Sequence, residues 1–314
     1  MSAEMNCPVV VLTSGQKLTL LRIMLYDEEG VQEVAKLRAQ LVATGEHWLW
    51  DAKTGAESAC LEGHSRSIAA LCLLPDGRLA SASHDGTIRL WDAEIGIESA
   101  HLENRSDIPF ADPVTALHPL PGGRLASAFW DETILIWNVK KGAAGAPLLS
   151  YSYTATTRQW HLDLVTPLCL LPDGRLAAGY QDNVIRLWDV KASAESAWLE
   201  GHAGGIRALC LLPDGRLASG SYDHTIRFWD VKTRAERARL EGYADGVCAL
   251  CLMANGQLAS GSYDHTIRLW DIGARREITR LEVDAPVYCL AALPDGRLAA
   301  GDQLGRVHWL EIVE

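Results

Sequence analysis

The chain has 314 residues, a formal net charge of −11 and 48% hydrophobic residues. A partner that presents a phosphate backbone calls for a basic surface, so this acidic balance argues against a nucleic acid. No apolar run approaches the length of a membrane-spanning helix, roughly 20 residues, and the N-terminus lacks the basic flank and cleavage site of a secretory signal. We therefore expect a protein with no nucleic-acid partner and no membrane partner.

Residues 1–37 are the least regular part of the chain, although 8–12 and 17–25 have the composition of strands. The next stretch has two interpretations. In the first interpretation, residues 27–42 form a helix that is capped by Asp27. In the second, strands at 31–37, 41–44 and 47–51 make a shortened first copy of the repeat that fills the rest of the chain. We favour the strands, because the helix would leave this first copy of the repeat without its first two strands.

One pattern recurs from about residue 38 to the end of the chain. Residues 209–230 read LCLLPDGRLASGSYDHTIRFWD, and close copies begin at Leu71, Leu168 and Leu250. Each copy holds three short β-type segments, separated by a Pro-Asp-Gly turn and by a second turn that contains Asp. A fourth segment, such as 235–241, precedes the next copy. Four short strands in a unit of about forty residues predict one blade of a propeller.

A tryptophan closes the third strand of most copies, and Asp or Asn follows it. Successive tryptophans stand 41, 46, 51, 41 and 41 residues apart, at Trp50, Trp91, Trp137, Trp188, Trp229 and Trp270. Together with Gly63-His64 and Gly201-His202 before first strands, this pattern resembles the WD-repeat β-propeller family over residues 38–314. The resemblance implies an all-β fold in a single domain, 1–314: a seven-bladed β-propeller of four-stranded antiparallel blades.

The end of the chain raises the question of how the ring closes. Leu310 takes the tryptophan position in the last copy, and only three residues follow Glu311. The last blade then has no chain left for its outermost strand, and an unpaired edge invites aggregation. Rings of this family close with strands from both termini. We therefore predict that residues 1–37, through 9–13 or 18–25, supply an N-terminal strand that closes the ring.

The eight cysteines suggest disulfides or a metal site until their positions are compared. Cys72, Cys169, Cys210 and Cys251 fall at one phase of the first strand, where a small buried residue suits the inner ring. Cys248 lies three residues before Cys251 on a strand, so the two point to opposite faces. We expect free thiols in a cytoplasmic protein, with no metal and no cofactor.

His202, Ser221 and Asp223 are the residue types of a catalytic triad, but His64, Ser83 and Asp85 repeat them. A nucleophile would occur once, on an exposed turn, so we expect no catalytic residue and no enzyme activity. The resemblance implies instead a buried hydrogen-bonded network of His, Ser, turn Asp and Trp. Its expected members are His64, Ser83, Asp85, Trp91, His161, Asp182, Trp188, His202, Ser221, Asp223, Trp229, Asp264 and Trp270.

The network is incomplete in some copies. Tyr243, Phe110 and Val283 stand at the histidine position of three blades, and Tyr180 replaces a serine. Four arginines share one phase of the third strand, two residues before tryptophan. They form either a cationic stripe or a solvated face that pairs with neighbouring acids, and we favour the second. These four are Arg89, Arg186, Arg227 and Arg268.

Two insertions, 103–112 and 148–164, each connect the outermost strand of one blade with the innermost strand of the next. In the family such connections lie on the face of the turn Asp, and partners contact the residue before that Asp and the start of each innermost strand. The resemblance thus implies an aromatic patch centred on Trp130 and Tyr222, which binds a peptide or loop. The predicted partner-binding residues are Trp130, Tyr222, Tyr263, Tyr288, Arg207, His84, Phe110 and Trp160.

The resemblance implies a non-enzymatic protein–protein interaction scaffold, which we expect to be a monomer with a protein or peptide partner. The alternative is a sensor or docking domain of a larger signalling or enzyme assembly. A propeller hydrolase with a metal or a carboxylate pair in its central channel is disfavoured, because the inward-facing strand residues are Cys, Leu and Ala. A fold by itself does not give a function.

Overall fold

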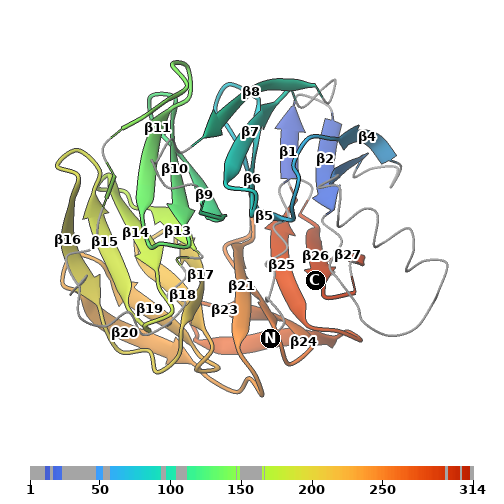
Figure 1. The fold of residues 1–314 in the computed structure, drawn as a ribbon. Coiled ribbons are helices and arrows are strands. Elements are labelled where there is room, and N and C mark those ends of the chain that lie inside the picture. Colours follow the sequence, from blue (N-terminus) through green and yellow to red (C-terminus); the bar gives the residue numbers. More distant parts are fainter. Residues whose placement is uncertain are drawn as a thin grey trace.

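The computed structural model describes residues 11–14, 17–22, 47–51, 57–92, 97–103, 112–145, 147–148, 165, 167–293, 296–304 and 306–311, with side chains from Leu61 onward. Every regular element in these ranges is a short β-strand. No helix in them is long and apolar enough to cross a bilayer. The strands form six four-stranded antiparallel sheets and one three-stranded sheet around a common centre (Figure 1).

We number the sheets in chain order, and within each sheet the strands also follow chain order. Sheet 1 contains β1 (Val11–Ser14), β2 (Lys17–Arg22), β3 (His47–Asp51) and β4 (Glu57–Leu61). Sheet 2 contains β5 (Ile68–Leu73), β6 (Leu79–Ser83), β7 (Thr87–Trp91) and β8 (Glu98–Glu103). Sheet 3 contains β9 (Val114–Leu120), β10 (Arg124–Phe129), β11 (Ile134–Asn138) and β12 (Ala143–Ala144).

The later sheets repeat this arrangement. Sheet 4 contains β13 (Leu168–Leu170), β14 (Arg175–Gly179), β15 (Ile185–Asp189) and β16 (Ala194–Leu199). Sheet 5 contains β17 (Ile206–Leu211), β18 (Leu217–Ser221), β19 (Ile226–Asp230) and β20 (Ala235–Leu240). Sheet 6 contains β21 (Val247–Leu252), β22 (Leu258–Ser262), β23 (Thr266–Asp271) and β24 (Arg276–Glu282). Sheet 7 contains β25 (Val287–Ala292), β26 (Leu298–Asp302) and β27 (Val307–Leu310).

The first strands of neighbouring sheets contact one another in order from β5 through β9, β13, β17 and β21 to β25. They surround the centre of the molecule, and the later strands of each sheet lie progressively farther out (Figure 1). The described residues therefore form an all-β propeller with four-stranded antiparallel blades. Six sheets have all four strands, so the expected count of seven four-stranded blades is not established by these residues.

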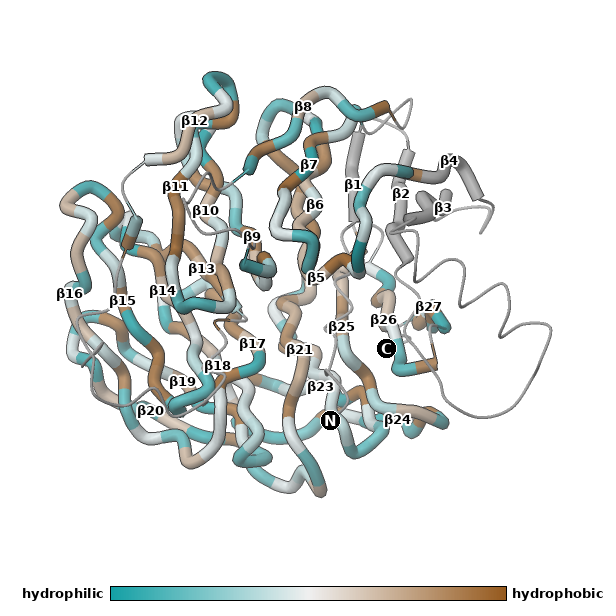
Figure 2. The backbone as a smooth tube through the Cα atoms, viewed as in Figure 1, coloured by the Kyte–Doolittle hydropathy of each residue, from teal (hydrophilic) through white to brown (hydrophobic). Residues whose placement is uncertain are grey.

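The core lies between adjacent sheets. Trp229 pairs in register with Leu217 of the preceding strand and is buried with Leu187 of sheet 4 and Ile206 of sheet 5. Figure 2 shows hydrophobic residues along the strands and hydrophilic residues at many turns. Burying large apolar side chains is the main favourable term in folding, so the repeated tryptophan stabilises the contact between neighbouring blades.

The predicted closing strand is wrong. β1 pairs with β2, and Leu20 of β2 pairs with Trp50 of β3, so both N-terminal strands complete sheet 1. Ser14 at the end of β1 pairs with Lys17 at the start of β2, so the two strands are antiparallel neighbours in one sheet. This pairing also overturns the expectation that 31–37 and 41–44 supply the first two strands of this blade. The alternative helix at 27–42 lies outside the described residues.

Candidate functional site

The triad-like residues of sheet 5 form a buried network. His202 Nδ1 lies 2.7 Å from Asp223 Oδ2, and His202 Nε2 lies 2.7 Å from Ser219 Oγ. Trp229 Nε1 donates to the same Ser219 Oγ over 2.8 Å. Sheet 2 repeats the arrangement at 2.9, 2.8 and 2.8 Å with His64, Asp85, Ser81 and Trp91.

The serines that link these networks are Ser81 and Ser219, not Ser83 and Ser221 as expected. Ser221 Oγ donates to Gly204 O over 2.7 Å and accepts from Asp223 N over 3.0 Å, so it supports the turn instead. Alternate residues of a strand face the same side of a sheet. Both serines therefore fit the pattern, and only the one farther from the turn reaches the tryptophan.

The geometry of the networks is that of a structural element. Ser219 is fully buried, so no substrate carbonyl reaches its hydroxyl. Burial raises the pKa of Asp223, but hydrogen bonds from His202 and Thr225 outweigh it and hold that pKa well below its usual range. The pKa of Asp85 is low for the same reasons, with His64 and Thr87 as donors. The charged carboxylates of Asp85 and Asp223 are thus occupied by hydrogen bonds within their own blades.

In sheets 4 and 6 a tyrosine lies beside the tryptophan and the arginine, although sheet 6 keeps the serine bond, from Trp270 Nε1 to Ser260 Oγ over 2.9 Å. Trp270 Nε1 donates to Tyr243 OH over 2.9 Å, and the Arg268 guanidinium lies 4.2 Å from the centre of the Tyr243 ring. Arg186 lies 4.1 Å from the centre of the Tyr180 ring, next to the buried Trp188. His161 of the expected network lies outside the described residues.

The four arginines of the third strands pair with acidic residues, as favoured from the sequence. Arg227 Nη1 donates to Glu236 over 2.6 Å, and Arg268 Nη2 donates to Asp264 over 2.9 Å. The expected solvated face is wrong, however, because Arg186, Arg227 and Arg268 are buried. Arg227 and Arg268 lie close to the loop that precedes the first strand of their own sheet, since an added Cβ would stand 2.9 Å from Arg227 Nη1 at Gly201 and 3.8 Å from Arg268 Nη1 at Gly242.

The residues that precede the turn Asp in sheets 2, 3, 5 and 6, and Gln303 at the corresponding position before Leu304 in sheet 7, share one backbone contact. In each case the peptide N–H donates to a carbonyl at the start of the first strand, which puts the side chain at an equivalent place on one face. The bonds are His84 to Ser67 (2.9 Å), Trp130 to Pro113 (3.1 Å), Tyr222 to Gly205 (3.0 Å), Tyr263 to Gly246 (2.9 Å) and Gln303 to Pro286 (2.8 Å). This face is where the sequence predicted partner binding.

Three tyrosines and an arginine gather over sheets 5 to 7, and we call them the tyrosine group. The rings of Tyr222 and Tyr263 stack at 5.7 Å, with their hydroxyls 3.3 Å apart. Tyr288 meets Tyr263 edge to face at 5.4 Å. The guanidinium of the buried Arg207 lies 5.1 Å from the centre of the Tyr222 ring. Gly246 makes room for this stack, since an added Cβ would stand 2.9 Å from Tyr222 Cδ1.

A second group lies over sheets 2 and 3. Trp130 meets His84 at a ring distance of 5.6 Å and an angle of 62°, and Ser67 Oγ lies 3.2 Å from His84 Nδ1. Burial lowers the pKa of His84, and the charge of Arg66 lowers it further. We call His84 and Trp130 the tryptophan group.

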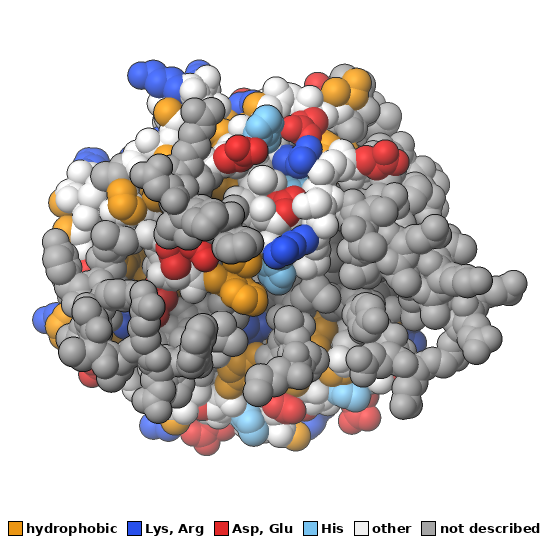
Figure 3. Space-filling view, viewed as in Figure 1, with side chains coloured by type: hydrophobic (Ala, Val, Ile, Leu, Met, Phe, Trp, Pro, Cys, Tyr) orange, Lys and Arg blue, Asp and Glu red, His pale blue; other side chains and the backbone are white. Residues whose placement is uncertain are grey.

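The predicted patch centred on Trp130 and Tyr222 is therefore divided, with sheet 4 and its Gln181 between the two groups. Arg207 and Tyr288 are buried, so they lie beneath this face and offer little surface to a partner. Two other predicted residues, Phe110 and Trp160, lie outside the described residues. Near the middle of the viewed face, acidic side chains lie beside hydrophobic ones, with a histidine and a basic side chain next to them (Figure 3).

Two carboxylates beside the tryptophan group were not predicted from the sequence. Asp131 is the exposed turn Asp of sheet 3, and Asp112 precedes the first strand of the same sheet. Burial and then the charge of Asp131 raise the pKa of Asp112. A signal existed in the sequence: Leu135 stands where other copies have the arginine that pairs with the turn Asp.

Metal and thiol chemistry find little support in the described residues. No group of three His, Cys, Asp or Glu side chains among them could hold a metal ion. Six cysteines with described side chains are free. Burial raises the pKa of Cys72 to about 12, and a thiol in that state is a poor nucleophile.

Repeated four-stranded blades with a Trp–Ser–His–Asp network define a β-propeller built from WD-type repeats. The family described as "WD domain, G-beta repeat" matches residues 55–92, 155–189 and 195–230. A second family, "TEP-1 C-terminal beta-propeller", matches residues 243–312. The chain belongs to the WD-repeat β-propeller family. No curated protein is significantly similar to it.

Proposed function

We propose that the protein is a non-enzymatic scaffold whose turn-Asp face binds a peptide or loop of a partner protein. Propellers of this family generally serve as protein-interaction scaffolds. The observation that carries the proposal is the equivalent placement of Trp130, Tyr222 and Tyr263, half-buried on one face. Aromatic side chains with a polar end give large contact area at low entropic cost, which is why they dominate interface energy.

The finer architecture belongs to the same proposal. Sheet 7 repeats the first three strands of the other blades, and β25 contacts β21 as other innermost strands contact their neighbours. We take it as the seventh blade of the ring. The free buried thiols suit a reducing compartment, so we place the protein in the cytoplasm, as a monomer that presents this face.

The test is the double variant Trp130→Ala with Tyr222→Ala, one change in each aromatic group. Proteins captured from the native lysate by the wild type are identified, purified and titrated against the variants. We expect the double variant to lose binding while its melting temperature stays within a few degrees of the wild type. Asp173→Asn with Asp214→Asn, in turns between first and second strands, is the control for the opposite face. Binding that survives the aromatic change but is lost in this control would contradict the proposal.

A further inference from the structure

The turn Asp of most described blades is held by a cationic or neutral side chain of its own sheet. Asp85 lies 2.9 Å from His64, Asp223 2.7 Å from His202, and Asp264 2.9 Å from Arg268. The side chains of these three carboxylates are only 7%, 7% and 4% exposed. In this setting the turn Asp is internal and unavailable to a partner.

By sequence, sheet 3 lacks both kinds of partner, because Phe110 stands at the histidine position and Leu135 at the arginine position. Leu135 replaces the arginine and packs in the core with Trp137. The turn Asp131 is exposed. Within the part of the chain that the structure describes, its carboxylate accepts hydrogen bonds only from Thr133, the residue two positions on. A carboxylate that is internal in sheets 2, 5 and 6 thus faces solvent here.

A second carboxylate lies next to it. The bond from Trp130 N to Pro113 O, 3.1 Å long, holds the turn against the entry to β9 and brings Asp112 beside Asp131. The equivalent position is Arg66 in sheet 2, Gly204 in sheet 5 and Ala285 in sheet 7. In sheet 6 it is Asp245, whose carboxylate lies 3.9 Å from His224. Two neighbouring negative charges destabilise each other, and no described cation is paired with either of them.

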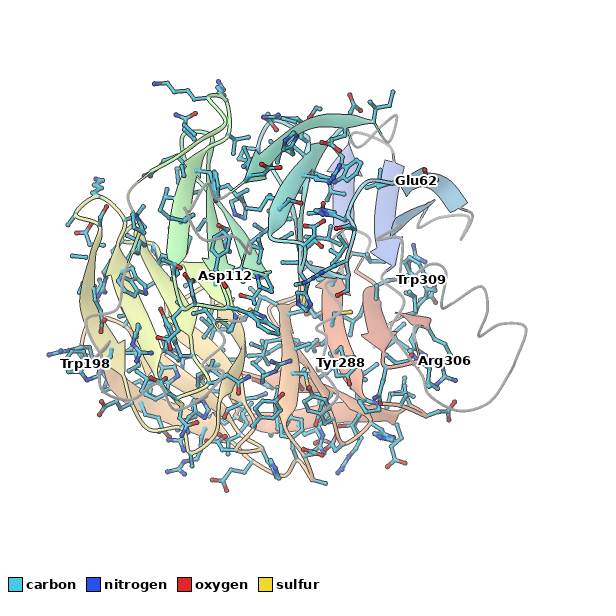
Figure 4. All side chains as sticks on the ribbon, in the orientation of Figure 1. Glu62, Asp112, Trp198, Tyr288, Arg306 and Trp309 are labelled. Atoms are coloured by element: carbon cyan, nitrogen blue, oxygen red, sulfur yellow. The ribbon has the colours of Figure 1, made fainter. Side chains whose placement is uncertain are left out.

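Trp130 directly precedes Asp131 in the sequence, and its indole contacts the ring of His84. It is half-buried and meets the histidine ring at 5.6 Å, which fixes its orientation. An aromatic face attracts a cation through its quadrupole, most strongly when the ring is tryptophan. Figure 4 places Asp112 toward the centre of the molecule, whereas Trp198 lies at the outer rim. The pair therefore lies where the proposed partner segment would cross the face.

We propose that Trp130, Asp112 and Asp131 bind a lysine or arginine side chain of the partner, so that the partner segment is basic. The proposal rests on the proposed function, because it assigns the chemistry of one position on that face. The cation would lie over the indole and neutralise the two carboxylates. The formal net charge of −11 adds a long-range attraction for a basic segment, and complementary charge at an interface favours the correct partner.

The experiment uses the full chain and two fluorescein-labelled probe peptides, (Gly-Ser-Arg)₄ and the same sequence with citrulline in place of arginine. Citrulline keeps the shape of the side chain and removes its charge. At physiological salt we expect fluorescence anisotropy to give binding of the arginine peptide at least tenfold tighter than that of the citrulline peptide. Asp112→Asn with Asp131→Asn should weaken binding of the arginine peptide about tenfold, and Trp130→Ala should weaken it by a similar factor.

The matched control is Asp173→Asn with Asp214→Asn, which removes an equal number of negative charges from the opposite face. It should change the affinity for the arginine peptide less than twofold. Equal losses in both double variants would overturn the proposal, since the attraction would then depend on net charge alone. Failure of the wild type to distinguish the two peptides would also overturn it. If the native partner still depends on Trp130 and Tyr222 but binds the Asp112/Asp131 variant normally, the proposed function stands and only the basic partner is excluded.

Discussion

Sheets 5 and 3 have the same strand order but use the turn Asp in opposite ways. In sheet 5, His202 and Arg227 both contact Asp223, at 2.7 and 3.5 Å, and the carboxylate is internal. In sheet 3, Leu135 occupies the arginine position and Asp131 is exposed. Both sheets keep a bond of 2.8 Å from the indole nitrogen of the third-strand tryptophan to a buried serine.

The comparison separates two requirements of a blade. The tryptophan–serine bond and apolar packing suffice for the strands to pair, because sheet 3 retains both. The cation beside the turn Asp adds internal stability to the blades that have it. Where a leucine replaces that cation, the same turn exposes its carboxylate, and a structural position becomes available for binding.

The largest expected effect comes from giving sheet 6 the leucine of sheet 3. Arg268→Leu leaves the carboxylate of Asp264 buried without its cation, since both side chains of this pair are only 4% exposed. Removing one partner of a buried ion pair costs about 3–5 kcal/mol. Urea denaturation should show the loss as a lower midpoint. Arg268→Lys, which keeps the charge, should lose less. A midpoint unchanged by the leucine would mean that the turn Asp does not need its cation.

A smaller effect distinguishes the serines of the two sheets. Ser219→Ala leaves two buried groups, His202 Nε2 and the indole N–H of Trp229, without their partner. Ser127→Ala in sheet 3 leaves only the indole of Trp137 among the described contacts. Each buried group without a partner costs about 1–3 kcal/mol, so the sheet 5 variant should melt at the lower temperature. Equal melting temperatures would show that the histidine bond contributes nothing.

The strands of the later blades could be predicted from the sequence because three local signals agree in them. The Pro-Asp-Gly turn, the turn Asp and the buried tryptophan fix the bounds of β18 and β19 within one residue, whereas β17 begins three residues before the Leu209 at which the repeat was taken to start. The network serine was assigned wrongly because Ser219 and Ser221 point to the same side of β18, and a pattern with period two cannot separate them. Only the distance from each serine hydroxyl to the ring of His202 shows which serine belongs to the network.

Other features depend on geometry that the repeat pattern does not contain. The order of Trp130 and Tyr222 along the chain already places them in sheets 3 and 5 with sheet 4 between them, and the prediction of one joint patch overlooked this separation. Asp112 was missed because it ends an insertion, where the repeat loses its period. At the N-terminus, the prediction rested on a general rule about ring closure, whereas β1 and β2 pair with each other and with β3 in sheet 1.

The response of stability to acid should distinguish the internal aspartates from Asp112. The pKa values of Asp85, Asp223 and Asp264 are lowered on folding, because hydrogen bonds outweigh the effect of burial. Their stabilising effect is present above the unfolded pKa, about 4, and is lost as the pH falls below it. The melting temperature should therefore fall steeply below pH 4. His202→Ala should make that fall shallower, since it removes one cause of the low pKa of Asp223.

The smallest effect has the opposite sign and concerns Asp112. Burial and the charge of Asp131 raise its pKa on folding, so its ionised form destabilises the folded protein at neutral pH and its protonated form does not. Asp112→Asn should therefore raise the stability at pH 7 by a few tenths of a kcal/mol, because exposed charges are screened, and the gain should vanish near pH 3. Asp245→Asn, at the equivalent position of sheet 6, removes a carboxylate that faces His224 and should bring no gain. Calorimetric melting of both variants at the two pH values measures the difference. A loss of stability in Asp112→Asn at pH 7 would show that this carboxylate has a favourable partner in the free protein, and would remove the electrostatic reason for a cation at sheet 3.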